Sequence, residues 1–284
     1  MFYNVVMNIE YDPDLKITDF NYNSYLKIDE LFSLQQLVSD PPHHDEMFFI
    51  IIHQASELWF KLIDFETHLL VKSFRDGSIS RSLKVLKRLN QVMDLMCKQI
   101  NLLSTLTPVE FAGFRNKINP ASGFQSSSFR KMEFVYGLRE EYFLKFFEKM
   151  MPEVVEELKD LAKKPSVYDE FLKALDDAGF KIPQNILNRD VTQNRQVSDK
   201  GLVSSFKNIY ENSGDQYHWV LICEALLDFD EKFSLFRQIH VAVVERCIGR
   251  KPGTGGSSGV EFLQKRTVLR LFPELWSVRT VIGK

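Results

Sequence analysis

A single histidine near the C-terminal end of the chain lies within an apolar helical stripe. The stripe has the spacing of one face of an α-helix and consists of Phe233, Phe236, His240, Val243, Val244 and Cys247. The polar residues expected largely off this face are Arg237, Gln238, Glu245 and Arg246. A neutral imidazole is the commonest metal ligand in proteins, and haem iron often takes one. His240 is therefore a candidate axial ligand, although a core histidine hydrogen-bonded to a neighbour gives the same pattern.

A glycine-rich loop with the sequence KPGTGGSSG follows this helix at residues 251–259. Its glycines permit positive φ angles and a close approach of the backbone to a ligand. Thr254 supplies the only threonine hydroxyl of the loop, and no Lys-Ser/Thr pair closes the pattern of a phosphate-binding P-loop. Such tracts are usually flexible linkers, but here an apolar segment resumes at Phe262. Helix and loop together predict one wall of a cofactor site.

A second histidine, His53, lies in a helical segment with Phe49 and Phe60 beside it. The core stripe of that segment is expected on the opposite side, from Phe48, Ile51, Ile52, Ala55, Leu58, Trp59 and Leu62. Aromatic neighbours on a face that should be solvated indicate that the face is covered or lines a pocket. A histidine in a contact between subunits, or one paired with Glu57 a turn later, explains the same residues.

A third group of candidates lies between residues 107 and 126. Phe111 and Arg115 are one helical turn apart, and a guanidinium beside aromatic rings can clamp a carboxylate with two parallel hydrogen bonds. A structural ion pair explains a lone arginine equally well. The turn that follows could place the hydroxyl of Ser122 and the bare backbone of Gly123 near a ligand.

The composition is that of an ordinary globular protein, with 44% hydrophobic and 26% charged residues among 284. The 24 phenylalanines indicate an aromatic core or an aromatic-lined pocket. A net charge of −2 with mixed signs argues against a nucleic-acid-binding face, and no apolar run approaches the roughly 18 residues of a membrane span. Cys97, Cys223 and Cys247 form no disulfide or C-x-x-C framework, and no signal peptide is evident. We therefore expect a cytoplasmic protein.

Helices must position these candidates, and the sequence predicts helix almost throughout. A Thr-Pro-x-Glu capping box starts a helix at Thr107, and Pro273 begins a last short one. Residues 188–200 are polar and aperiodic, as in a surface loop. The other expected helices span 22–36, 45–72, 79–103, 140–163, 167–178 and 215–250. Without a convincing strand or repeat, we expect an all-α fold of packed, partly antiparallel helices.

Taken together, these segments resemble the tryptophan 2,3-dioxygenase family. The matching stretches, in the order of the family, are HHDEMFFIIIHQASELWFKL, LTPVEFAGFR, NPASGFQSSSFR, HVAVVERCIGRKPGTGGSSG and FPELWSVRT. They cover most of the chain from Tyr22 to Thr280. The patterns HQ-x-SELW-x-K, SGFQS-x-x-FR and G-x-K-x-GTGGSSG are each specific, and their co-occurrence favours the functional interpretations over the structural ones.

The resemblance implies an all-helical homotetramer, a dimer of dimers, with one b-type haem in each subunit. The whole chain, 1–284, would form a single domain, with an N-terminal arm over 1–40 and a helical haem-binding core over 41–284. His240 would be the axial ligand of the haem iron, which is Fe(II) in the active state. Ser122 and Gly123 would lie beside the haem on its distal side.

The resemblance also implies roles for residues around an L-tryptophan substrate. His53 would be the catalytic residue, facing O2 and the indole N–H, and Phe49 would pack on the indole. Arg115 would pair with the carboxylate, and Thr254 would contact the ammonium group as the glycine loop closes. The other residues expected to bind substrate are Ser122, Phe111 and, from the N-terminal helix of a neighbouring subunit, Tyr22, Tyr25 and Leu26.

The activity that the resemblance implies is the addition of both atoms of O2 across the indole C2–C3 bond, which gives N-formyl-L-kynurenine. This is the first step of tryptophan degradation by the kynurenine pathway. Two alternatives stay open at this point: mono-oxygenation of another indole in a secondary-metabolite pathway, and a non-catalytic haem or tryptophan sensor. Several bacterial members carry tyrosine where this chain has Phe111, so a hydrogen bond to the substrate carboxylate is missing here.

Overall fold

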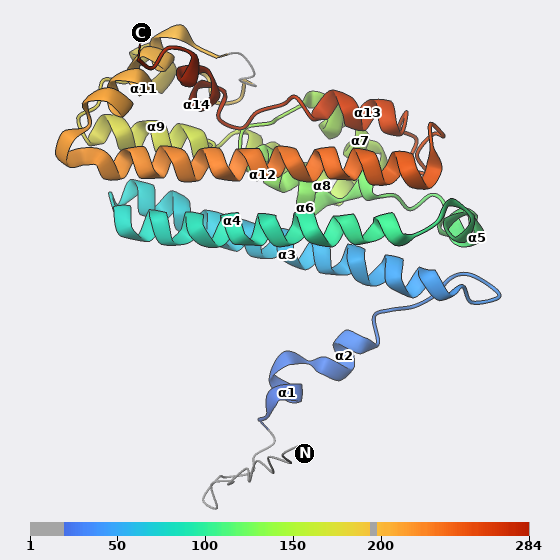
Figure 1. Ribbon diagram of the computed structural model, residues 1–284. Helices are drawn as coiled ribbons and strands as arrows, with labels where there is room; N and C mark the ends of the chain where they lie inside the picture. Colours follow the sequence, from blue (N-terminus) through green and yellow to red (C-terminus); the bar gives the residue numbers. More distant parts are fainter. Residues whose placement is uncertain (1–19, 194–197, 284) are drawn as a thin grey trace, which may run out of the picture. The chain divides into compact units, whose positions relative to one another are not determined.

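The computed structural model describes residues 20–193 and 198–283, and within these ranges the chain is helical, with no strand (Figure 1). The expected all-α fold is confirmed. The chain divides into two compact units, Met1–Leu37 and Val38–Lys284, which are described separately. Among the described residues, no helix is long and apolar enough to cross a membrane.

Three long helices form the frame of the larger unit: α3 (His44–Arg75), α4 (Ile79–Leu102) and α12 (Tyr217–Ile248) (Figure 1). α4 packs against both of the others along its length. Gly77, with a φ of 62°, allows the chain to reverse between α3 and α4. Through α4 the frame therefore joins α3 and α12, which are far apart in sequence.

Shorter helices cover this frame, and α5 lies at one end of it (Figure 1). They are α5 (Pro108–Ile118), α6 (Ser127–Val135), α7 (Glu141–Met150), α8 (Pro152–Ala162), α9 (Val167–Asp177), α10 (Gln184–Leu187), α11 (Lys200–Asn212), α13 (Val260–Arg266) and α14 (Pro273–Ser277). Single 3-10 turns are η1 (Leu103–Thr105), η2 (Gly123–Gln125), η3 (Gly214–Gln216) and η4 (Val278–Thr280). One large apolar core fills the frame, and α6, α7 and α8 enclose a smaller one.

Most predicted helices are confirmed within a few residues, including the capping box of Thr107 and Glu110 at the start of α5. The single helix predicted over 140–163 is wrong. The chain leaves the helical conformation at Met151, and Pro152 begins α8 at its first position. Proline lacks the backbone donor that a continuous helix needs, which is why α7 and α8 are separate.

The smaller unit also differs from the single helix predicted over 22–36. It contains α1 (Tyr22–Leu26) and α2 (Ile28–Phe32), separated by Lys27 in the left-handed conformation at a φ of 55°. Neither helix has a buried residue. The exposed large apolar side chains of this unit are Phe20, Tyr22, Tyr25, Leu26, Leu31, Phe32 and Leu34. The described part of this unit therefore has no apolar core of its own.

The core-facing side of α3 is rotated relative to the prediction. Ile51 and Leu58, expected in the core, are 48% and 55% exposed. Ile52 is buried as predicted, and the other buried apolar residues of α3 are Phe60, Ile63, Leu70 and Phe74. The reason is that α3 packs against α4, α6 and α9, which contact the side that carries these buried residues. Ile51, Leu58 and Phe65 are left as an exposed line at seven-residue spacing.

Asp230 of α12 fixes the C-terminal segment to the frame. Its Oδ2 accepts hydrogen bonds from the backbone N–H groups of Leu271 and Phe272 at 3.0 and 3.1 Å, and from Trp276 Nε1 at 2.9 Å. The carboxylate is fully buried, and burial raises its pKa. One side chain therefore satisfies three donors that would otherwise be buried without partners.

Replacing Asp230 with alanine should destabilise the fold strongly. The substitution leaves three buried donors unpaired, so the free energy of unfolding should fall by at least about 2 kcal/mol in urea denaturation. Asp228→Ala, at an exposed position half a turn away, is the matched control and should change it by less than about 0.5 kcal/mol. Equal effects of the two substitutions would show that the Asp230 contacts do not anchor the segment.

Candidate functional site

His53 on α3 and His240 on α12 approach each other from opposite walls of the frame. Phe60, two turns after His53, contacts Phe236, one turn before His240, with ring centroids 6.5 Å apart. Phe129 of α6 packs against both phenylalanines at 5.3 and 6.1 Å. The structure thus brings together two helices whose histidines are 187 positions apart in the sequence, and the three phenylalanine rings pack between these helices.

Both imidazoles are held in the neutral form. Burial, together with the proximity of His53 and the charge of Arg130, lowers the pKa of His240 to about 4. Burial also lowers the pKa of His53, against a smaller opposing effect of its hydrogen bond to Phe49 and of Glu57. Each histidine is nevertheless only half-buried as a residue. A neutral, accessible imidazole surrounded by apolar side chains is suited to bind a metal or to accept a hydrogen bond.

The contacts of His53 decide which ring nitrogen faces the site. Nδ1 lies 2.8 Å from the carbonyl oxygen of Phe49, and a carbonyl can only accept, so Nδ1 carries the hydrogen. Nε2 is then left with its lone pair. Glu57 does not compete for the ring in hydrogen bonding, since it accepts from the hydroxyl of Ser126 at 2.6 Å. The pairing of His53 with Glu57 that the sequence left open is therefore not the arrangement found.

An aromatic shelf adjoins His53. The Phe49 ring lies 4.1 Å from the His53 ring and stacks on Phe111 of α5 at 5.5 Å. Phe114 packs against Phe49 and Phe111, and Gly113 beside it has no room for a Cβ because the His43 ring lies against it. Two of the predicted substrate-binding residues, Phe49 and Phe111, are therefore in contact.

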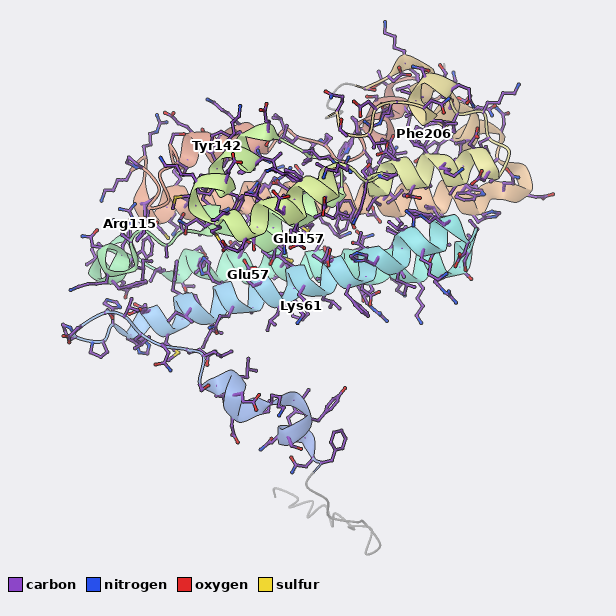
Figure 2. All side chains as sticks on the ribbon, turned by 180° about the vertical axis from the view of Figure 1, so that it is seen from behind. Glu57, Lys61, Arg115, Tyr142, Glu157 and Phe206 are labelled. Atoms are coloured by element: carbon purple, nitrogen blue, oxygen red, sulfur yellow. The ribbon has the colours of Figure 1, made fainter. Side chains whose placement is uncertain are left out.

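The glycine loop is held against the α5–η2 segment by the two polar residues singled out from the sequence. Arg115 Nη2 donates to the carbonyl oxygen of Pro252 at 2.7 Å, and Thr254 Oγ1 donates to that of Ala121 at 2.8 Å. Gly255 faces Ser122 so closely that a Cβ would lie 2.8 Å from the Ser122 Cβ. Figure 2 shows Arg115 at one end of the long helices, opposite the end that carries Phe206 of α11.

The remaining predicted site residues lie either at η2 in the larger unit or on α1 in the smaller unit. Ser122 caps η2 by accepting from the N–H of Phe124 at 3.3 Å, and Gly123 is exposed with open space where a Cβ would be. Both lie on the segment that the glycine loop contacts. Tyr22, Tyr25 and Leu26 are exposed on α1 in the smaller unit, at 73%, 68% and 42%.

The sequence did not reveal a cluster of charges beside His240, here called the arginine cluster. Its members are Arg130, Glu133, Glu140, Arg237 and Arg266. Glu133 is fully buried and accepts from Arg237 Nη2 at 2.6 Å, from Arg266 Nη2 at 3.0 Å and from Arg130. Arg237 lies off the apolar stripe, as predicted, yet is buried, because α6 and α13 cover that side of α12. The Arg-x-x-Glu spacing of 130–133 was the only signal available.

The donor set fits a haem better than a bare metal ion. Among the described residues, no three His, Cys, Asp or Glu side chains gather as a metal site, whereas a porphyrin supplies four ligands and needs one axial histidine. Cys247, on the same stripe as His240, is a poor alternative, since burial raises its pKa and its Sγ donates to the carbonyls of Leu103 and Leu106. Arg130 Nε is buried without a partner near His240, which suits an acidic haem substituent.

The buried imidazoles predict a pH-dependent stability of the ligand-free protein. The unfolded chain protonates His240 near pH 6.5 and the folded chain only near 4, so the unfolded state binds more protons between these values and stability is lost as the pH falls. His240→Gln should flatten the fall in the free energy of unfolding between pH 6.5 and 4, measured with urea. His68→Gln, on the exposed side of α3, is the matched control, and identical slopes in both variants would contradict the assignment.

Comparison with known proteins identifies the family of the chain. A family model described as tryptophan 2,3-dioxygenase matches residues 13–164 and 162–282. The tryptophan 2,3-dioxygenase of Arthrobacter sp. (strain FB24) is 45% identical over 264 residues, which cover 93% of this chain and 92% of that protein. That of Xanthomonas euvesicatoria pv. vesicatoria (strain 85-10) is 43% identical over 262 residues, covering 92% and 87%. The chain therefore belongs to the tryptophan 2,3-dioxygenase family.

Proposed function

We propose that this protein is a haem-dependent dioxygenase that converts L-tryptophan and O2 into N-formyl-L-kynurenine. Family membership supports the reaction, and one observation in the structure carries the assignment. The rings of Phe60, Phe129 and Phe236 pack together between the helices that carry two neutral imidazoles, and Arg115 and Thr254 bind the glycine loop to the segment that carries Phe111. Such an arrangement offers His240 as a ligand for iron and His53 as a hydrogen-bond acceptor for a substrate. Arg115 and Thr254 could bind the carboxylate and ammonium groups of an amino acid.

The haem, when bound with its iron in the ferrous state, supplies the activation of dioxygen. His240 would hold the iron, because its imidazole is neutral and α12 fixes its position. Arg130 would meet an acidic substituent of the haem with its unpaired Nε, and Ser122 and Gly123 would border the group from the opposite segment. Haem b, with one group in each subunit, remains a proposal that these contacts support.

His53 would orient the indole of the substrate. Its Nε2 has a free lone pair, since Nδ1 donates to the carbonyl of Phe49, and an indole N–H is a donor only. The lowered pKa of His53 keeps this acceptor available at neutral pH. Phe49 and Phe111 offer ring faces for the indole, and their apolar surroundings exclude water from the reacting C2–C3 bond.

Arg115 and Thr254 would recognise the amino-acid head of the substrate. A carboxylate is a stronger partner for a guanidinium than the neutral carbonyl of Pro252, because the hydrogen bond is then charge-assisted on both sides. The hydroxyl of Thr254, now donated to Ala121, could accept from the substrate ammonium. The substrate would thus replace the bond of Arg115 to the Pro252 carbonyl, while Thr254 would contact the ammonium group from the loop itself. Phe111 adds no hydrogen bond, so Arg115 carries more of the carboxylate recognition.

Self-association as a homotetramer is part of the proposal, and exposed apolar surface in each unit supports it. In the smaller unit Tyr22, Tyr25 and Leu26 have no core to bury them. In the larger unit Ile51, Leu58 and Phe65 recur every seven residues on the outer side of α3, which is the spacing of a helix–helix contact. Completion of the site by the arm of a neighbouring subunit, and a cytoplasmic location, stay predictions.

The direct test is reconstitution with haem, reduction, and addition of L-tryptophan and O2. Absorbance of N-formylkynurenine should appear, and His240→Ala should lose the Soret band of bound haem. A normal Soret band without product would exclude the dioxygenase and favour a haem or tryptophan sensor. A product that contains one oxygen atom from O2 would favour mono-oxygenation instead. Full haem occupancy in His240→Ala would show that the axial ligand is another residue.

Arg115→Ala should separate recognition of the carboxylate from recognition of the indole. Loss of a charge-assisted hydrogen bond costs about 1.5–3 kcal/mol, so KM for L-tryptophan should rise by at least about tenfold, measured by product formation. Inhibition of L-tryptophan turnover by tryptamine, which lacks the carboxylate, should change far less. Lys117→Ala, exposed on the same helix, is the control and should alter neither value. Equal losses for both ligands would remove Arg115 from carboxylate binding.

A further inference from the structure

The arginine cluster joins three elements around the helix that carries His240. Glu133 of α6 bonds to Arg237 of α12 and to Arg266 at the end of α13, and Arg266 also pairs with Glu140. Arg130, one turn before Glu133, completes the group. The guanidiniums of Arg130 and Arg237 also lie over phenylalanine rings at 4.0 and 4.1 Å, so the cluster is enclosed by apolar surface.

The cluster carries an excess of positive charge. Burial alone would raise the pKa of Glu133, but the three arginines hold it at about 2, while burial lowers that of Arg130 only to about 10. Glu133 and Arg130 are therefore ionised at neutral pH, and the cluster contains three guanidinium groups and two carboxyl groups. The Nε groups of the three arginines are buried without a hydrogen-bond partner among the described residues. Asp230 and Arg270, the next charges near Arg237, oppose each other.

This excess charge lies next to the axial histidine. Arg237 precedes His240 by three residues, or about 4.5 Å along the axis of α12. Arg130 is close enough for its charge to act on the His240 imidazole. Because apolar side chains surround the cluster, its field is screened less than that of charges in solvent.

We propose that the arginine cluster stabilises the ferrous state of the haem iron. Reduction of ferric to ferrous iron adds one electron and removes one positive charge from the site, so a fixed positive charge nearby favours the reduced form. The electron comes from an external one-electron donor, and the cluster only shifts the equilibrium. The inference rests on the haem-dependent function proposed above, in which ferrous iron is the form that binds dioxygen.

Two substitutions that break the same ion pair separate a charge effect from a structural one. Glu133→Gln adds one unit of net positive charge to the cluster, and Arg237→Met removes one. The midpoint potential of the haem, measured by spectroelectrochemical titration, should rise in the first and fall in the second. A tenfold change in the ferrous-to-ferric ratio, about 59 mV for one electron, is the expected size of each shift. The double variant restores the net charge and should return towards the wild-type potential.

Two further variants keep the test decisive. Glu140→Gln, at a side chain 33% exposed, should raise the potential even if Glu133→Gln fails to fold. Glu224 lies on the same helix as His240, sixteen residues before it, and pairs with Arg279. Glu224→Gln breaks this distant ion pair and should leave the midpoint potential unchanged. Circular dichroism and the Soret band confirm that each variant is folded and loaded with haem.

The outcomes distinguish this inference from the proposed function. Shifts of opposite sign in the acidic and basic variants support it. Shifts of the same sign, or none in folded haem-loaded variants, overturn it while leaving the dioxygenase assignment intact if the wild type still forms N-formylkynurenine. A wild-type protein that binds no haem overturns both.

Discussion

The burial of the Glu133 carboxylate among three arginines constrains most of the site. A buried charge without a partner costs several kcal/mol, so Glu133 can be accommodated only where all its partners converge. One partner, Arg237, lies on α12 about one turn before His240 and fixes that helix to Glu133. Another partner, Arg266, is the last residue of α13, the helix that follows the glycine loop. The helix that carries His240 and the helix that follows the glycine loop are therefore anchored at one carboxylate.

Around Glu133, the contacts that hold the two histidines are rigid, whereas those that hold the glycine loop can be exchanged. The two imidazoles are carried by helices packed along their whole length, and their neutrality comes from burial, which no local motion reverses cheaply. The glycine loop is instead held by two side-chain bonds to backbone carbonyls, from Arg115 and Thr254. Bonds of this kind contribute about 0.5–1.5 kcal/mol each. In the function proposed above, groups of the substrate would replace these bonds without disturbing the frame.

Several features of the site could be predicted because they depend on local spacing. The capping box at Thr107, the apolar stripe of His240 and the aromatic neighbours of His53 are all visible within one or two helical turns. The rotation of α3, which exposes Ile51 and Leu58, could not be read in the same way. A helix with apolar residues on more than one side has no single preferred face until its neighbours are known.

The sequence by itself determined the helical class, the candidate chemistry of His53, Arg115, His240 and Thr254, and the family to which the chain belongs, because residue types and short spacings carry that information. Only the tertiary structure decided that the Nε2 atom of His53 is the free acceptor, that Arg115 and Thr254 hold the loop, and that Arg237 is buried in a charged cluster. Each of these depends on contacts between residues more than a hundred positions apart or on the geometry of one hydrogen bond, and neither leaves a periodic signal in the chain.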